Sequence, residues 1–321
     1  MSGSISPFVI HILPRESMSW EEFLRNTPDR SIALDGVVHG GPNFDPETCH
    51  LNSDHHDGVI REVTMSTGMQ IYFAIKGGLF KAFAVSGKGP IHIYINDTDQ
   101  DTAFAVWLLL NYKLFEGTQS IPVINRLLAL NDRWDITGGA FPMNLDDRLV
   151  RNHNWVFRPY TDLRKSGFLA KATAEMLRDN LDAVLRRLDL YLMGQAGEED
   201  LDTRREILYD SPIYKIVDEI GGNEARYLLF NQGMDAFISL VARRDDGRFV
   251  YSIGRRSRYI VQFPVPSLYD VLNDAEGFTR ANGWNGSDIV GGSSRLNGSG
   301  LSWEQLRNLT NDHLRTLGIS V

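Results

Sequence analysis

Short apolar runs alternate with stretches of helical spacing along the first half of the chain. Phe8 to Leu13, Ser31 to Val38 and Ile91 to Ile95 have the length and the side chains of buried strands. Ser19 precedes two glutamates, which is typical of a capped helix start. Further helices are expected over residues 59–76, 101–112 and 121–130. Strands that alternate with helices predict an α/β fold, with a mostly parallel sheet flanked by helices.

A longer apolar pattern follows and precedes a change of composition. Within residues 163–193, apolar side chains recur at steps of four and three on one face of a helix, at Leu177, Leu181, Val184, Leu188 and Tyr191. They predict one long helix that packs against a core. Residues 194–202 are polar and acidic, so we place a domain boundary there. We expect an α/β domain over residues 1–195 and a smaller α+β domain over residues 203–321.

The second half of the chain mixes strand and helix patterns. A helix interrupted at Pro212 is expected within residues 203–220, and short strands are expected over residues 225–229, 236–242 and 248–253. Residues 245–247 have the Asp-Asp-Gly sequence of a hairpin turn between the last two strands, and residues 267–273 should be helical. Seven of the 24 residues from Gly277 to Gly300 are glycine, which is typical of a loop that comes close to a ligand.

The net charge and the cysteine content disfavour some classes of protein. With 33 basic and 41 acidic residues the formal charge is -8, which disfavours a surface that holds long nucleic acid. The single cysteine, Cys49, excludes an internal disulfide and suits a reducing compartment, so we expect a cytoplasmic protein. No secretory signal is visible, and the longest apolar run, Ala103 to Leu110, is too short for a membrane helix. We expect no membrane partner, and homo-oligomerisation stays open.

Acidic and histidine side chains follow the apolar segments. Asp35 lies near the end of an expected strand with His39 four residues later, and Asp54-His55-His56 comes next. Such residues offer carboxylate oxygens and imidazole nitrogens to divalent cations. Taken alone, the tripeptide is equally consistent with a solvated polar loop.

Two further acidic groups strengthen the pattern. Asp97, Asp99 and Asp101 lie between the strand over residues 91–95 and the next helix, at the sheet edge where open α/β folds bind ligands. Three carboxylates in five residues repel one another, which favours a bound cation; helix capping would explain one of them but hardly three. Asp132 and Asp135 have the spacing of one side of a helical turn. Together these groups predict one metal site.

These motifs resemble the DHH family of phosphoesterases, which includes nanoRNA hydrolases, single-strand exonucleases, exopolyphosphatases and family-II inorganic pyrophosphatases. The family name describes the Asp-His-His at positions 54–56, and residues 34–46 are similar to the segment before it in one branch. Residues 99–101 and 132–135 resemble two acidic motifs, and residues 291–299 resemble a glycine-rich loop of the associated substrate-binding domain. The motif order is permuted here, and Ile95 stands where the family has a histidine.

The resemblance implies a set of site residues. One or two Mn²⁺ or Mg²⁺ ions would be held by acidic loops and one histidine, at Asp35, His39, Asp54, Asp97, Asp99, Asp101, Asp132 and Asp135. Asp54, His55 and His56 are the expected catalytic residues, because histidines there can orient the phosphate or protonate the leaving oxygen. Substrate phosphate would meet arginine forks and exposed backbone N–H groups, at Arg255, Arg256, Gly291, Gly292, Ser293 and Arg295.

The expected function is therefore metal-dependent hydrolysis of a phosphoester or phosphoanhydride in a small substrate, such as a short oligonucleotide or a cyclic dinucleotide. The alternative is a catalytically inactive regulatory protein that binds a metal or a nucleotide. Two departures from the family pattern motivate that alternative, namely Ile95 and the Ser-Ser-Arg sequence at positions 293–295. For Arg255 and Arg256, a solvated basic surface is the alternative to phosphate binding.

Overall fold

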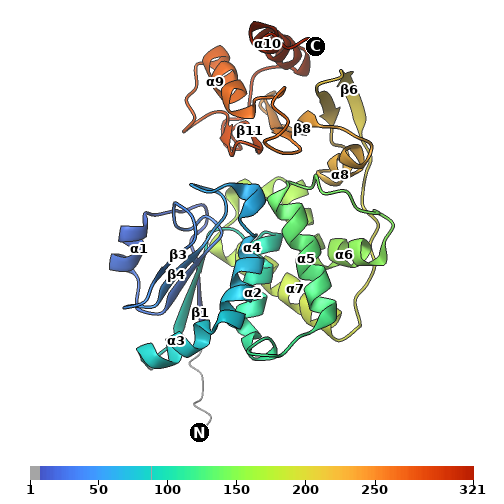
Figure 1. Ribbon diagram of the computed structural model, residues 1–321. Helices are drawn as coiled ribbons and strands as arrows, with labels where there is room; N and C mark the ends of the chain where they lie inside the picture. Colours follow the sequence, from blue (N-terminus) through green and yellow to red (C-terminus); the bar gives the residue numbers. More distant parts are fainter. Residues whose placement is uncertain (1–7, 88) are drawn as a thin grey trace. The chain divides into compact units, whose positions relative to one another are not determined.

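The computed structural model describes residues 8–87 and 89–321, which divide into two compact units (Figure 1). The first unit runs to Ile136 and also includes Asp146–Glu199, and the second comprises Thr137–Leu145 and Asp200–Val321. The first unit was expected to be continuous up to residue 195. Residues 137–145 instead pack within the second unit, where the backbone of Met143 exchanges two hydrogen bonds with the side chain of Asn231.

A five-stranded sheet forms the centre of the first unit. Its strand order is β1 (Phe8–Ile12), β5 (Ile91–Ile95), β2 (Ser31–Leu34), β4 (His50–Ser53) and β3 (Asn43–Asp45). The first four strands pair in parallel, and β3 is antiparallel to β4. The expected α/β fold with a mostly parallel sheet is confirmed. The short polar strands β3 and β4 were not anticipated, and β2 ends four residues earlier than expected.

The two faces of this sheet bury different side chains. Ile91, Ile93 and Ile95 pack into the larger core with the helices α2 (Thr67–Gly77), α4 (Gln100–Leu110) and α7 (Ala174–Leu192). Tyr94 lies on the opposite face with Phe23 of α1 (Trp20–Asn26). Since successive strand residues point to opposite faces, helices cover both sides of the sheet (Figure 1). Ser19 and Glu22 form the expected capping box at the start of α1.

The remaining helices of the first unit correct two expectations. The expected helix over residues 163–193 is two helices, α6 (Arg148–Lys165) and α7, because the chain turns at Gly167, whose φ is 74°. The apolar stripe that predicted it lies on α7 and is buried. The segment from residue 59 begins with the turn η1 (Arg61–Val63), so α2 starts only at Thr67. The other elements are α3 (Leu79–Ser86), η2 (Tyr112–Leu114), α5 (Pro122–Ile136) and η3 (Phe168–Lys171).

The second unit is an α+β arrangement around a six-stranded sheet. Its strand order is β10 (Asn285–Gly286), β11 (Val290–Gly292), β9 (Phe249–Arg255), β8 (Ala236–Arg243), β7 (Lys215–Asp218) and β6 (Glu206–Asp210). The hairpin of β8 and β9 is as expected. The helix expected over residues 203–220 is wrong, because β6 and β7 pair as a hairpin there. The strand expected over residues 225–229 is also wrong. It is the helix α8 (Glu224–Asn231), and the unit also contains α9 (Val265–Glu276) and α10 (Trp303–Thr316).

Two glycines of the glycine-rich segment are explained by neighbouring protein atoms. A Cβ atom at Gly292 would overlap the carbonyl oxygen of Tyr251, and one at Gly291 would overlap the carbonyl oxygen of Asn285 and the hydroxyl of Tyr269. Both glycines lie on β11, between β10 and β9. Close strand approach therefore requires glycine at these positions whether or not a ligand binds.

No helix among the described residues is long and apolar enough to cross a membrane.

Replacing Gly292 with alanine should destabilise the protein by about 1–3 kcal/mol, because the added methyl group forces β11 away from Tyr251. Gly77→Ala is the matched control, since no atom lies within 4 Å of a Cβ there and its backbone is helical. Urea unfolding monitored by circular dichroism would measure both changes. Equal stability of the two variants would contradict this packing.

Candidate metal centre

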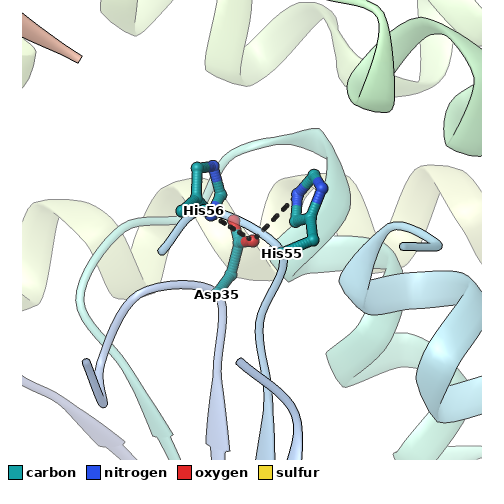
Figure 2. Close-up of side chains that lie close together, drawn as sticks. All are labelled: Asp35, His55 and His56. Atoms are coloured by element: carbon teal, nitrogen blue, oxygen red, sulfur yellow. Dashed lines mark ion pairs between the residues drawn. The ribbon is translucent and has the colours of Figure 1, made fainter. Parts of the chain in front are cut away.

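Three neighbouring parallel strands bring their carboxyl ends to one edge of the first sheet. Asp35 follows β2, Asp54 and the two histidines follow β4, and residues 97–101 follow β5. Because β2 pairs in parallel with both β4 and β5, these side chains meet at the same edge. Figure 2 shows the carboxylate of Asp35 beside the imidazoles of His55 and His56.

Asp35 is held by its backbone and by two threonines. Its φ of 53° lies in the left-handed region, which aspartate tolerates better than most residues. Its N–H donates to the carbonyl of Ser53 at 2.9 Å, so β2 turns away where β4 ends. Thr67 donates its hydroxyl to Oδ1 at 2.9 Å, and Thr102 donates to Oδ2 at 3.1 Å. These two hydrogen bonds fix the orientation of the buried carboxylate and give each of its oxygens a partner.

His55 lies at the meeting point of two groups that can hold a metal ion. One group is Asp35, His55 and His56, and the other is His55, Asp101 and Asp135, with the ligand atoms of each group within 4.8 Å of one another. His55 Nε2 is 2.8 Å from Asp135 Oδ2, 3.6 Å from Asp35 Oδ1 and 4.0 Å from Asp101 Oδ2. The imidazole is fully buried. The arrangement provides carboxylate oxygens and imidazole nitrogens around a common point.

Several buried polar atoms of this cluster make no hydrogen bond with the described residues. They are Nδ1 of His55 and the Oδ2 atoms of Asp54 and Asp101, whereas Nε2 of His55 and Oδ2 of Asp135 face each other at 2.8 Å. A buried polar atom without a partner costs about 1–3 kcal/mol, so such atoms are rare unless something else binds them. Oxygen and imidazole donors of this kind suit a divalent cation. The buried Asp and His groups therefore fit a metal ion.

The carboxylates of the cluster titrate abnormally. Burial, together with the neighbouring Asp135, Asp35 and Asp99, raises the pKa of Asp101 well above its usual value. Burial, followed by the charges of Asp35 and Asp97, does the same to the pKa of Asp99. Burial also opposes ionisation of Asp135, but His55 and Arg61 hold its pKa below the usual range. Negative charge is in excess here, and a bound cation would relieve it.

His56 is the more exposed of the two histidines. Its Nδ1 is 2.9 Å from Asp54 Oδ1 and 3.4 Å from Asp35 Oδ1, and its side chain is 40% exposed. Burial alone would lower the pKa of His56, but the charge of Asp35 and the hydrogen bond that His56 donates to Asp54 raise it to about 9. Since Nδ1 faces the carboxylates, the other ring nitrogen can meet a ligand.

Supporting residues that no sequence motif indicated surround the cluster. Asp101 Oδ1 accepts hydrogen bonds from the N–H of Gly68 at 3.1 Å and from Asn131 Nδ2 at 3.0 Å. Arg61 Nη2 donates to the carbonyl oxygen of Asp135 at 2.9 Å. A sequence signal existed for Asn131, since it is a polar residue on the apolar stretch before Asp132.

Other expected metal ligands lie outside both groups. Asp99 is the N-cap of α4 and accepts from the N–H of Thr102, so the capping alternative is correct for this residue. Four more are bonded elsewhere. His39 is exposed and lies 3.0 Å from Ser17 Oγ, Asp54 accepts from His56, Asp97 accepts from Tyr160 and Thr98, and Asp132 accepts from the N–H of Ser66. These five residues belong to neither group, although Asp54 adjoins His56.

The expected substrate-binding residues all lie in the second unit. Arg255 is buried and donates to the carbonyl oxygens of Asp288 and Ile260. Arg256 donates to the carbonyl oxygens of Phe230 and Met234. The hydroxyl of Ser293 accepts from the N–H of Tyr251, whereas Arg295 is exposed. Phosphate binding by these residues stays a prediction. Of the three arginines, Arg295 is the one whose side chain is most exposed.

The fold and the site define an α/β protein with a candidate divalent-metal centre at the carboxyl edge of a parallel sheet. No family model matches the chain, and no curated protein matches it. The likeness to the DHH phosphoesterases therefore rests on the motifs, above all Asp54, His55 and His56.

In the metal-free protein, His56 should titrate near pH 9, and Asp54→Asn should shift its pKa toward the ordinary 6.5 because one carboxylate is lost. Since folding raises this pKa, the stabilisation that His56 provides is complete below pH 6.5 and is lost as the pH rises through about 9. NMR titration of the imidazole would measure the shift. A pKa near 6.5 in the unsubstituted protein would contradict the charge arrangement.

Proposed function

We propose that this protein is a divalent-metal-dependent phosphohydrolase that cleaves a phosphoester or phosphoanhydride bond in a small substrate. The observation that carries the proposal is that buried His55 belongs to two groups that can hold a metal ion, at the sheet edge where open α/β folds bind ligands, and that Asp101 Oδ2 in one group has no hydrogen-bond partner. The Asp-His-His motif that resembles the DHH phosphoesterases supplies that histidine.

The residues that would hold the metal are those whose ligand atoms converge. Asp35, His55, Asp101 and Asp135 offer oxygens and one imidazole nitrogen, a mixture that suits Mn²⁺ and, with its carboxylates, Mg²⁺. When bound, such an ion supplies Lewis acidity and neutralises negative charge on the phosphoryl group. The excess of carboxylates at this edge fits that role.

His56 is suited to act on the substrate. Asp54 orients its ring through Nδ1, which leaves the other ring nitrogen available to the substrate. The outward Nε2–H can then donate a hydrogen bond to a phosphoryl oxygen or pass its proton to the leaving oxygen. Asp54 holds the imidazole of His56 in place in this scheme.

The net charge limits the class of substrate. A chain with a formal charge of -8 is a poor binder of long nucleic acid, whose affinity depends on many phosphate contacts. Short oligonucleotides, cyclic dinucleotides, pyrophosphate and polyphosphate remain as small phosphorylated substrates. Hydrolysis of a short oligonucleotide or a cyclic dinucleotide is the activity we propose.

Metal or nucleotide binding without turnover is the second candidate function. Ile95, which stands where the resemblance expects a histidine, is fully buried in β5 and packs in the apolar core. It offers no ligand atom, so a second metal would have to bind with one protein ligand fewer. Such a loss favours a binding protein over an enzyme.

Purified protein with Mn²⁺ should hydrolyse at least one member of a panel containing short oligonucleotides, cyclic dinucleotides, mononucleotides, pyrophosphate and polyphosphate. Asp101→Asn and Asp135→Asn should each reduce the rate by about 100-fold or more, because each removes a charged ligand from the centre. Asp162→Asn is the matched control, since it changes a surface aspartate that pairs with Arg158 across one turn of α6. Product formation would be followed by chromatography.

Activity that survives in Asp162→Asn and is lost in both cluster variants would support the phosphohydrolase. No turnover, together with an Mn²⁺-dependent rise in melting temperature that Asp101→Asn abolishes, would establish the binding protein instead. Absence of any Mn²⁺ effect on turnover and on melting would overturn both functions.

A further inference from the structure

A chain of three buried polar side chains leads from α6 to the metal centre. His153 Nε2 lies 3.1 Å from Asn131 Oδ1, and Asn131 Nδ2 donates to Asp101 Oδ1 at 3.0 Å. The three residues come from α6, α5 and α4, and each is only 1% exposed. Three separate helices therefore place polar groups in line within an otherwise apolar interior.

Chemistry fixes the direction of each hydrogen bond in this chain. Asp101 Oδ1 already accepts from the N–H of Gly68, so the amide nitrogen of Asn131 faces this oxygen and the amide oxygen of Asn131 faces His153. That oxygen also accepts, so His153 must carry its proton on Nε2. Burial lowers the pKa of His153 to about 3, which keeps the ring neutral with a single proton. Every donor in the chain thus points toward Asp101.

The two carboxylate oxygens of Asp101 therefore differ: Oδ1 accepts hydrogen bonds from the protein, and Oδ2 faces the other ligand atoms of the centre. Asp101 Oδ1 accepts from Asn131 and from the N–H of Gly68. Asp101 Oδ2 has no hydrogen-bond partner and belongs to the group with His55 and Asp135. If the donors to Oδ1 were lost, the carboxylate could rotate and turn Oδ2 away from His55.

We propose that Asn131 and His153 form a positioning pair that sets the affinity of the centre for its divalent cation by fixing the orientation of Asp101. The inference rests on the proposed function only through its metal site. Hydrogen-bond partners of ligating carboxylates typically contribute 10- to 100-fold to metal affinity. Neither residue touches the cation or the substrate, so both act through Asp101.

His153 also packs against aromatic rings, which defines the competing structural role. Its ring lies edge-on to Trp134 at 5.2 Å between centroids and 4.7 Å from the ring of Phe157. A purely structural histidine would affect stability and leave metal affinity unchanged. His153→Phe keeps a ring between these neighbours and removes the donor, whereas His153→Gln loses the ring and keeps an amide donor.

Isothermal titration calorimetry with Mn²⁺ alone separates the two roles. Asn131→Leu should weaken Mn²⁺ binding by about 10- to 100-fold, and His153→Phe should weaken it in the same direction. His153→Gln should bind Mn²⁺ more tightly than His153→Phe even though it loses the aromatic packing. Asn152→Leu is the control, because it removes a buried hydrogen bond of α6 to the carbonyl oxygen of Gly197 and should leave Mn²⁺ affinity unchanged.

The outcomes distinguish this inference from the function on which it rests. Unchanged Mn²⁺ affinity in both Asn131→Leu and His153→Phe would overturn the positioning role while leaving the metal centre intact. An equal loss of affinity in Asn152→Leu would also overturn it, since the effect would then follow general destabilisation. Failure of the unsubstituted protein to bind Mn²⁺ would instead remove the metal centre and the positioning role together.

Discussion

Buried carboxylate charge at one sheet edge is the constraint on which the rest of the site depends. Parallel pairing of β2, β4 and β5 forces their carboxyl ends together, and α4 and α5 add Asp101 and Asp135. Burial and mutual repulsion disfavour ionisation of such groups, and His55 alone does not partner all of their oxygens. A divalent cation bound by these groups would offset this charge.

Hydrogen bonds from the surrounding protein hold the carboxylates in place but leave some carboxylate oxygens without a partner. Asp35 has both oxygens bonded to threonines, whereas Asp101 has one oxygen held by Gly68 and Asn131 and the other unpartnered. This difference indicates distinct roles for the two carboxylates within one centre. A cation that binds only the folded chain would also stabilise it, so binding and folding are coupled at this edge.

The sequence predicted the helices and strands whose own residues show a clear apolar or capping pattern. It did not predict elements that form through contacts with distant parts of the chain. The apolar strand β5 and the capped helix α1 were predicted correctly. Of the expected metal ligands, Asp35, Asp101 and Asp135 lie together with His55, and the last two come from helices and not from loops. The strand β4 is short and polar, and its pairing with β2 and β3 is not visible in its own sequence pattern. The helix α6 was largely missed because its buried face carries polar residues such as Asn152 and His153. Asp97 accepts a hydrogen bond from Tyr160 of α6, a distant partner that a linear pattern does not show. Asp99 instead caps its own helix, which the sequence had offered as the alternative to metal binding.

Anomalous diffraction at the manganese absorption edge, from crystals grown with Mn²⁺, would test the central claim most directly. The account predicts a manganese peak within bonding distance of His55 and of carboxylate oxygens from Asp101 and Asp135. The peak should disappear in Asp101→Asn crystals grown in the same way. A well-ordered cluster with no peak at full manganese concentration would contradict the assignment of a metal centre to this sheet edge.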